Sequence, residues 1–231
     1  MASSRKSPLM RLSALSPDGA GGIAPVGSGV DKRQSILRGA LEVFLEGGYA
    51  GTSMDAVARR AGVAKQTIYS HFKDKESLFK SLIEQITFDF SSASVQKELF
   101  ALDARAFLPR FATMFLGRMD NWQYIAFMRL LIGESARFPE LAHAYVERVA
   151  KPGLAVMTEY FRNSPELNFP DPEAAARVYM GSMVSLILTQ EVLHGKRFLD
   201  MSRERYASTL VDIMLYSSEK FAEQAGLSGR D

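Results

Sequence analysis

The sequence predicts an all-α fold with two domains, an N-terminal three-helix unit built around a helix-turn-helix and a larger helical C-terminal domain. Apolar residues recur at helical spacing over most of the chain after residue 30, and no segment alternates as a half-buried strand does. Gly, Pro, Asn or Asp separate the helical segments. A chain of 231 residues with 47% hydrophobic side chains can bury two cores.

Residues 1–30 are rich in Ser, Gly, Pro and Ala and show no helical period, which predicts a flexible arm. A G-x-G-x-x-A pattern, typical of dinucleotide loops, occurs at Gly19, Gly21 and Ala24. No strand precedes this pattern and Pro25 follows where a helix should begin, so we reject the nucleotide site. The arm carries basic side chains at Arg5, Lys6 and Arg11. It is therefore either an inert tail, the reading we favour, or an arm that contacts DNA.

A first helix is predicted from Asp31 to Glu46 by one apolar face, and Gly47 with Gly48 should end it. The face consists of Ile36, Leu37, Ala40, Leu41, Phe44 and Leu45. We expect this helix to cover the next two helices and to complete a three-helix core.

The stretch from Thr52 to Lys75 predicts two short helices joined by a turn at Gly62, where glycine adopts a positive φ most easily. Their shared apolar face consists of Val57, Ala58, Ala61, Val63, Ile68 and Phe72. Thr52 is the expected N-cap, with Asp55 as the acidic partner of a capping box. The first helix should therefore begin near Ser53.

Polar side chains remain on the outward face of the second helix and just after it: Lys65, Gln66, Thr67, Tyr69, Ser70, His71, Lys73 and Lys75. Lys donates only, Gln can donate and accept at a base edge, and hydroxyls suit phosphate oxygens. The net charge is +2 over residues 1–30, +3 over residues 31–80 and −3 over the rest, so the basic end is the N-terminal one. This segment is therefore typical of a reader of double-stranded DNA.

From Arg33 to Lys80 the chain resembles the TetR family of bacterial transcriptional regulators, whose helix-turn-helix ends in a pattern seen here at Tyr69, His71, Phe72, Lys73 and Lys75. The resemblance implies that Lys65 and Gln66 read bases. It also implies phosphate contacts by Thr52, Thr67, Tyr69, His71 and Lys75, and Ser70 belongs to the same DNA-binding face. A solvated surface histidine remains the alternative for His71.

One residue departs from the family pattern at the start of the recognition helix. Many members have Ser there, and this chain has Ala64. The helix therefore lacks a capping hydroxyl worth about 1 kcal/mol, so packing or DNA should hold its N-terminus.

Asp74 should cap a longer helix, which in the family links the two domains, with an apolar face of Leu78, Phe79, Leu82, Ile83 and Ile86. Further helical segments are predicted near residues 104–119, 121–137, 139–163, 171–195 and 202–224. Pro139 and Pro172 suit first turns, Asp171 is a suitable cap, and Pro152 should kink its segment. We expect an arm (1–30), a DNA-binding domain (31–80) and an effector-binding and dimerisation domain (81–231).

Bulky apolar residues are concentrated in the middle of the C-terminal part, where they either fill a core or line a cavity for an apolar ligand. For any one of them the core is the commoner use. The resemblance implies a pocket for a small effector, lined by Phe107, Phe111, Phe115, Trp122, Phe127 and Tyr160. Arg129 and Glu134 are the candidates for polar contacts to this effector, with an ion pair inside the chain as the alternative. The run from Arg129 to Leu141 resembles the AefR-like subgroup.

The last two long segments carry apolar residues that predict a partner surface: Tyr179, Met180, Met183, Ile187, Leu188, Leu210, Ile213, Met214 and Phe221. Gly181, Ser182 and Ser185 permit close backbone approach. Similar helices in the TetR family form a four-helix contact, which implies a two-fold dimer that reads a pseudo-palindrome. Burial within one subunit is the alternative.

Several classes of protein and site are disfavoured by what the sequence lacks. It has no cysteine, which excludes disulfides, thiol catalysis and cysteine-rich metal sites. His71, His143 and His194 are far apart in sequence, and no H-E-x-x-H, P-loop or G-x-S-x-G pattern occurs. We therefore expect no enzyme, cofactor or metal site. No apolar run matches a signal peptide or a membrane span, so we expect a soluble, cytoplasmic protein.

These expectations combine into one functional hypothesis with a stated alternative. The chain is predicted to be a homodimeric repressor that binds a pseudo-palindromic operator and is released by a small, lipophilic effector. The alternative is an activator, or a ligand-independent regulator whose C-terminal domain serves only dimerisation or protein contacts.

Overall fold

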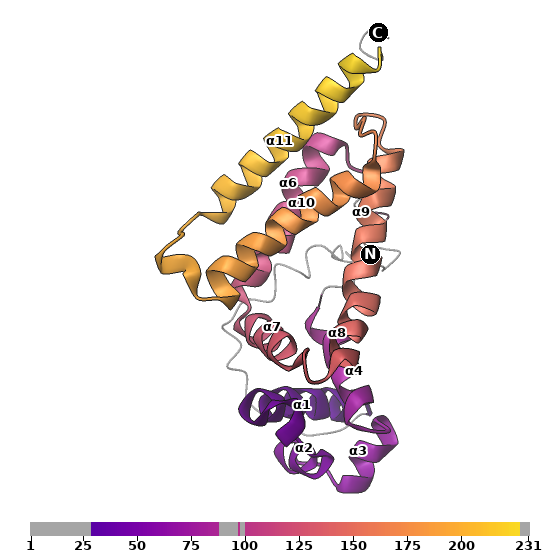
Figure 1. The fold of residues 1–231 in the computed structure, drawn as a ribbon. Helices are drawn as coiled ribbons and strands as arrows, with labels where there is room; N and C mark the ends of the chain where they lie inside the picture. Colours follow the sequence, from indigo (N-terminus) through magenta and orange to yellow (C-terminus); the bar gives the residue numbers. More distant parts are fainter. Residues whose placement is uncertain (1–28, 88–96, 98–99, 227–231) are drawn as a thin grey trace, which may run out of the picture.

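The fold of a computed structural model is shown in Figure 1; it describes residues 29–87, 97 and 100–226. The predicted all-α class is confirmed, because every regular element in these residues is helical. All but the last two residues of the predicted arm lie outside the described residues, as do the G-x-G-x-x-A pattern and the three basic residues of that arm.

The N-terminal domain, called the head below, contains four helices: α1 (Gly29–Gly51), α2 (Met54–Ala61), α3 (Lys65–His71) and α4 (Lys75–Ile86). They enclose a core that includes Ile36, Phe44, Val57, Ile68 and Phe79, all fully buried. Burying apolar area is what stabilises helices as short as α2 and α3, which would not persist alone in water. The predicted three-helix core is therefore confirmed, with α4 as a further wall.

The end of α1 differs in detail from the prediction. The helix is interrupted at Gly48, whose φ of 68° and ψ of 176° are not helical, and one more turn follows to Gly51. Gly62, at the turn after α2, has the predicted positive φ, at 65°. A side chain at either position would be strained by this backbone conformation.

The predicted N-cap of α2 was wrong by one residue. Ser53 is the cap, and its Oγ accepts a hydrogen bond from the backbone N–H of Ala56 at 3.1 Å. Thr52 is only 4% exposed, and its hydroxyl donates backwards to the carbonyl of Gly48 at 2.8 Å. Thr and Ser are both good N-cap residues. Ser53 rather than Thr52 caps α2 because the Thr52 hydroxyl is used in the bond to Gly48, and the spacing of residues in the sequence does not reveal that bond.

The cap of α4 is confirmed. The Asp74 carboxylate accepts from the backbone N–H of Ser77 at 2.7 Å, and the Ser77 hydroxyl lies 3.1 Å from the Asp74 N–H, which completes a capping box. Four of the predicted apolar residues of α4 are buried and Ile86 is partly buried.

The C-terminal domain is built from longer helices: α6 (Ala104–Leu116), α7 (Trp122–Glu134), α8 (Pro139–Tyr145), α9 (Lys151–Asn163), α10 (Pro172–Ile187) and α11 (Arg203–Gln224). In Figure 1, α7 lies just above α1, and α11 runs along the upper left of the molecule. The π-helical turn Leu188–Val192 that follows α10 contacts α7. Helix α10 packs on α9, and α11 packs on α6. None of the helices in the described residues is long and apolar enough to span a membrane.

The proline predictions were correct at the helix starts. Pro139 and Pro172 lie in the first turns of α8 and α10, and Asp171 caps α10 by accepting from the Ala174 N–H at 3.0 Å. At Pro152 the chain stays helical, and a π-helical turn over Val146–Ala150 leads into α9. The wider turn is how the helix accommodates a residue that has no N–H to donate.

Candidate nucleic-acid interface

Helix α3 presents the polar face that the sequence predicted. Ile68 is fully buried and anchors the helix to the head core, while Lys65, Gln66, Tyr69, Ser70 and His71 are exposed. Thr67 is partly buried. Figure 1 places α3 at the end of the molecule opposite α11, so this face is free for a large partner. The arrangement suits insertion of a short helix into the major groove.

The start of α3 lacks a side-chain cap, as predicted. Ala64 is the N-cap residue, with φ −66° and ψ 149°, and it makes no capping hydrogen bond. Packing of Ile68 is therefore what holds the helix, together with the Gly62 turn.

Lys65 already has a partner within the head. Its Nζ lies 2.9 Å from the carboxylate of Asp55 in the first turn of α2, and this hydrogen bond raises the pKa of Lys65. Both side chains are exposed, so the pair is weak. A base or a phosphate can therefore replace Asp55 at little cost.

The structure places Thr52 and Lys75 away from the α3 face. The Lys75 Nζ donates to the carbonyl of Tyr49 at 2.7 Å and lies 4.4 Å from the centre of the Tyr49 ring. Burial lowers the pKa of Lys75. Both side chains therefore bind backbone carbonyls near the C-terminal end of α1, and their contact with DNA stays a prediction.

Two arginines at the end of α2 differ in their surroundings. Arg60 bridges back to α1, with its guanidinium 2.9 Å from Glu42 and 2.6 Å from Glu46, and these hydrogen bonds raise its pKa. Arg59 is exposed next to the turn that leads into α3. Sequence reasoning did not single out either residue, although the position of Arg59 beside the buried Val57 and Ala58 indicates an outward side chain.

The residues predicted to line an effector pocket are not brought together as one cavity. Phe107, Phe111, Phe115 and Tyr160 are buried in the C-terminal core, and the rings of Phe107 and Tyr160 stack with centroids 3.6 Å apart. Phe127 belongs to the head core, where its ring lies 5.1 Å from that of Phe79. Trp122 is 67% exposed at the start of α7. In this conformation all of these aromatic residues except Trp122 fill cores, which is the alternative use that the sequence analysis gave.

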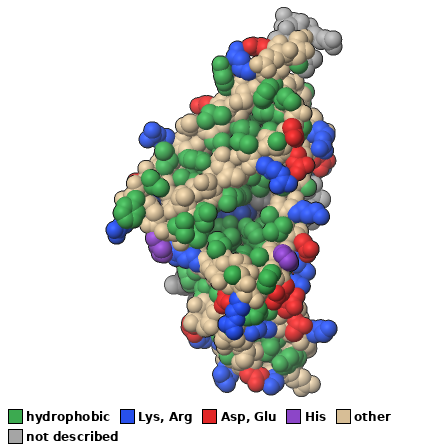
Figure 2. All heavy atoms as spheres, in the orientation of Figure 1, with side chains coloured by type: hydrophobic (Ala, Val, Ile, Leu, Met, Phe, Trp, Pro, Cys, Tyr) green, Lys and Arg blue, Asp and Glu red, His purple; other side chains and the backbone are tan. Residues whose placement is uncertain are grey.

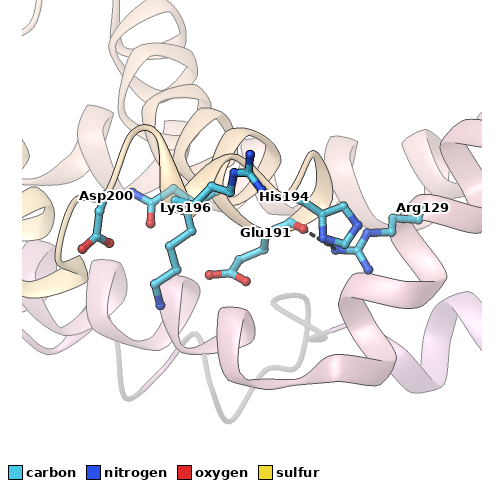
Figure 3. A pocket seen from close by; sticks show the side chains of 7 residues that line it. Arg129, Glu191, His194, Lys196 and Asp200 are labelled. Atoms are coloured by element: carbon cyan, nitrogen blue, oxygen red, sulfur yellow. Dashed lines mark hydrogen bonds between the residues drawn. The ribbon is translucent and has the colours of Figure 1, made fainter.

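The two polar candidates, Arg129 in the middle of α7 and Glu134 at its last residue, both contact backbone groups. Arg129 donates through Nε to the carbonyl of Val192 at 2.9 Å and through Nη2 to the carbonyl of Glu191, at the end of α10. It also lines a hollow of about 690 Å³ with Glu191, His194, Lys196 and Asp200, seen in Figure 3. Glu134 accepts from the backbone N–H of Tyr49 at 2.8 Å.

The predicted partner surface divides between a buried and an exposed face. Tyr179, Met183, Ile187, Leu210 and Met214 are buried within the subunit, which corrects their assignment to a partner contact. Met180 and Leu188 are partly buried, and Ile213 and Phe221 are exposed. Exposed apolar side chains that the sequence analysis missed lie beside them: Val178, Val184 and Tyr216. Figure 2 shows apolar side chains along both helices on one face of the molecule.

Comparison with known proteins relates both parts of the chain to one family. The model described as bacterial regulatory proteins, tetR family, matches residues 36–82, and the model described as AefR-like transcriptional repressor, C-terminal domain, matches residues 106–217. A putative TetR-family transcriptional regulator from Mesorhizobium loti has a similar structure, with 28% identity and a TM-score of 0.67 over 83% of this chain and 98% of that one. The flavonoid-responsive regulator FrrA has 29% identity and a TM-score of 0.57 over 84% and 96%.

The curated relatives match only a part of this chain. The uncharacterized HTH-type transcriptional regulator YhgD of Bacillus subtilis is 45% identical over 53 residues, which is 23% of this chain and 28% of YhgD. The fatty acid metabolism regulator protein of the same species is 39% identical over 79 residues, 31% of this chain and 41% of that protein. The chain thus matches less than half the length of each. Because matching models cover both the head and the C-terminal domain, the chain belongs to the TetR family of bacterial DNA-binding transcriptional regulators, which are not enzymes, and has an AefR-like C-terminal domain.

Proposed function

We propose that the protein is a homodimeric repressor that binds a pseudo-palindromic operator and leaves it when a small molecule binds the C-terminal domain. The observation that carries this proposal is the polar face of α3, which Ile68 holds outward from a rigid core. Lys65 and Gln66 are suited to base edges, and Tyr69 with His71 to phosphates. Similarity of residues 106–217 to a repressor domain supports repression over activation.

Dimerisation is supported by the exposed apolar side chains of α10 and α11. Val178, Val184, Ile213 and Tyr216 lie on two long helices beside the small exposed residues Gly181 and Ser185. A contiguous apolar surface of this kind is typical of a contact with another protein. An isologous contact through these helices would direct two α3 helices to successive major grooves.

The class of effector is supported by the aromatic core and by one relative. Phe107, Phe111 and Tyr160 offer flat apolar surfaces between α6 and α9. FrrA is described as flavonoid-responsive, and flat aromatic molecules would stack on such rings. These rings contact each other in the present conformation, so an effector would bind a conformer in which they separate and would shift the population towards it.

The DNA-binding proposal is tested by selection of bound fragments from random duplexes with purified protein. We expect enrichment of two inverted half-sites. Gln66→Ala should change the selected bases, whereas the matched change Gln224→Ala, at an exposed glutamine near the end of α11, should not. Failure to enrich any sequence, or identical selections by all three proteins, would contradict the proposal.

The effector proposal is tested separately by thermal unfolding with a panel of flavonoids. Phe111→Leu keeps the side chain apolar and of similar size, so the fold should survive. We expect ligands to raise the melting temperature of the parent protein and to release its selected DNA, and Phe111→Leu to weaken both effects. Equal ligand responses in the two proteins would contradict this site.

A further inference from the structure

Helix α7 is a member of both hydrophobic cores. Tyr124 and Ile125 pack in the core of the C-terminal domain, whereas Phe127 and Leu131 pack in the head core. Figure 1 shows the helix lying over α1, and it also contacts the π-helical turn Leu188–Val192 that ends α10. Since close-packed cores transmit displacements, any movement of α7 must affect both domains.

The last residue of α7 reaches into the head. The Glu134 Oε1 accepts the backbone N–H of Tyr49 at 2.8 Å, just beyond the interruption of α1. A Cβ at Gly48 would lie 2.6 Å from this same oxygen, so glycine there both adopts the positive φ and leaves room for the carboxylate. A hydrogen bond from an amide to a charged acceptor is stronger than a neutral one.

Tyr49 is held from the other side as well. Its carbonyl accepts from the Lys75 Nζ at 2.7 Å, at the start of α4. Its ring packs against those of Phe44, Phe79 and Phe138, with the Phe138 centroid 4.9 Å away. Both backbone polar groups and the side chain of Tyr49 are thus fixed four residues before Ser53, the cap of α2. The last turn of α1, which leads into α2 and through it to α3, is therefore attached to α7.

The second attachment of α7 is Arg129, in the middle of the helix. Its guanidinium donates to the carbonyls of Glu191 and Val192, where α10 ends. Both attachments use backbone groups as partners, which cannot swing away as side chains can. One helix is consequently tied to the proposed dimer helix by Arg129 and to the DNA-reading head by Glu134.

We propose that α7 is a strut that sets the spacing between the two α3 helices of a dimer, and that Glu134 is the positioning residue that couples this strut to the head. The proposal rests on the proposed function as a dimeric reader. Glu134 does not touch DNA in this scheme. It therefore determines which half-site separation the dimer accepts, and not which bases it prefers.

The test compares Glu134→Ala, which removes the acceptor, with Glu134→Gln, which keeps an acceptor oxygen at the same reach. Two quantities are measured on the full chain. The first is hydrogen exchange of the Tyr49 amide without DNA. The second is the ratio of affinities for the selected duplex and for the same duplex with one base pair inserted between its half-sites.

We expect Glu134→Ala to speed hydrogen exchange of the Tyr49 amide by about tenfold. It should lower the ratio of the two duplex affinities, called the spacing ratio, by a similar factor, because one hydrogen bond to a charged acceptor contributes a free energy of that order. Glu134→Gln should stay within about threefold of the parent in both measurements, because a neutral bond remains. The bases selected within each half-site should not change. Glu159→Ala, which removes an exposed carboxylate of α9, is the matched control and should change nothing.

Unchanged Tyr49 exchange in Glu134→Ala would overturn the attachment itself. Faster exchange with an intact spacing ratio would overturn the positioning role while leaving the bond. If no duplex is selected at all, the proposed function fails, and the exchange measurement still decides whether Glu134 holds Tyr49. Should Glu134→Ala not fold, Glu134→Asp, whose carboxylate is one methylene shorter, should give the same two effects in the same direction.

Discussion

The exposed ion pair between Lys65 and Asp55 bears on how α3 would engage DNA in the proposed function. If Lys65 contacts a base or a phosphate as proposed, it exchanges Asp55 for that partner. An exposed pair is worth about 0–1 kcal/mol, so this exchange is cheap. The remaining carboxylate would then repel the phosphate backbone and lower the affinity for every duplex, whatever its sequence.

Asp55→Asn should tighten binding to random duplexes several-fold while leaving the bases selected at the operator nearly unchanged. The substitution removes the competing charge, and the helix cap is untouched because Ser53 supplies it. Fluorescence anisotropy with random and selected duplexes measures the two affinities. Asp212→Asn, at an exposed position of α11, is the control. Equal affinities of Asp55→Asn and the parent protein for random DNA would contradict this role.

The phenol of Tyr49 makes stability depend on pH at alkaline values. Burial raises the pKa of Tyr49 to about 12, above the value near 10 of an exposed phenol. The folded chain keeps this proton where the unfolded chain loses it, so the free energy of unfolding falls as pH rises from about 10 to 12. Tyr49→Phe should make this fall shallower, as measured by urea unfolding across the range, while the exposed Tyr216→Phe should not. Parallel curves for parent and Tyr49→Phe would refute the assignment.

Local residue roles were predictable only where the partner is close in sequence. Gly62, the missing cap at Ala64 and the cap at Asp74 follow from neighbours a few residues away, and all three were predicted correctly. The inward bonds of Thr52 and Lys75 depend on where α1 ends in space, which spacing alone does not encode.

At the scale of elements, α3 is a helix with little local support. It spans only Lys65–His71 and begins without a capping hydroxyl. Short helices depend on packing for their stability, and here Ile68 provides most of it. A capping hydroxyl at the start of α3 should therefore stabilise this helix.

Ala64→Ser should stabilise the protein by about 0.5–1 kcal/mol, because the backbone at residue 64 already has the extended conformation that an N-cap needs. Chemical denaturation followed by circular dichroism gives the difference in unfolding free energy. Ala64→Gly, which supplies no hydroxyl, serves as the comparison. A serine variant no more stable than the glycine variant would show that packing and the Gly62 turn leave no capping group to satisfy.

The helices were largely predictable as elements, because apolar periodicity and helix-start residues mark them. Whether an apolar face packs in a core or lines a pocket was not predictable from the sequence. Aromatic residues such as those of α6 and α9 occur both in cores and in the walls of pockets. Only their contacts with one another, such as that between the rings of Phe107 and Tyr160, show that they pack as a core here. The π-helical turns before Pro152 and after α10 likewise have no signature in residue spacing.

At the scale of the whole molecule, the exposed face of α10 and α11 is the surface that a dimer would bury. The sequence analysis assigned residues from both faces of α10 to the partner contact, because both faces of this helix are apolar. Tyr179 and Met183 point into the subunit, whereas Val178 and Val184, one residue away from each, are exposed.

Ile213→Glu should convert the proposed dimer into a folded monomer, because a carboxylate would be buried without a partner in the contact. Ile213 is 54% exposed in the isolated subunit, so the subunit fold should tolerate the change. Val146→Glu, at a residue that is 52% exposed on the π-helical turn before α9, is the control. Light scattering reads the mass of each protein. A dimeric Ile213→Glu protein, or a monomeric parent, would exclude this contact.

The bridge from Arg60 to Glu42 and Glu46 has a consequence for ion release on DNA. Each phosphate that a cationic side chain neutralises frees about 0.9 of a condensed counterion. Arg60 would have to leave two carboxylates of α1 before it could neutralise a phosphate, whereas the adjacent Arg59 is exposed beside the turn that leads into α3. In the proposed function, Arg59 rather than Arg60 would therefore contribute to the dependence of DNA affinity on ionic strength. Arg60 instead joins α2 to α1.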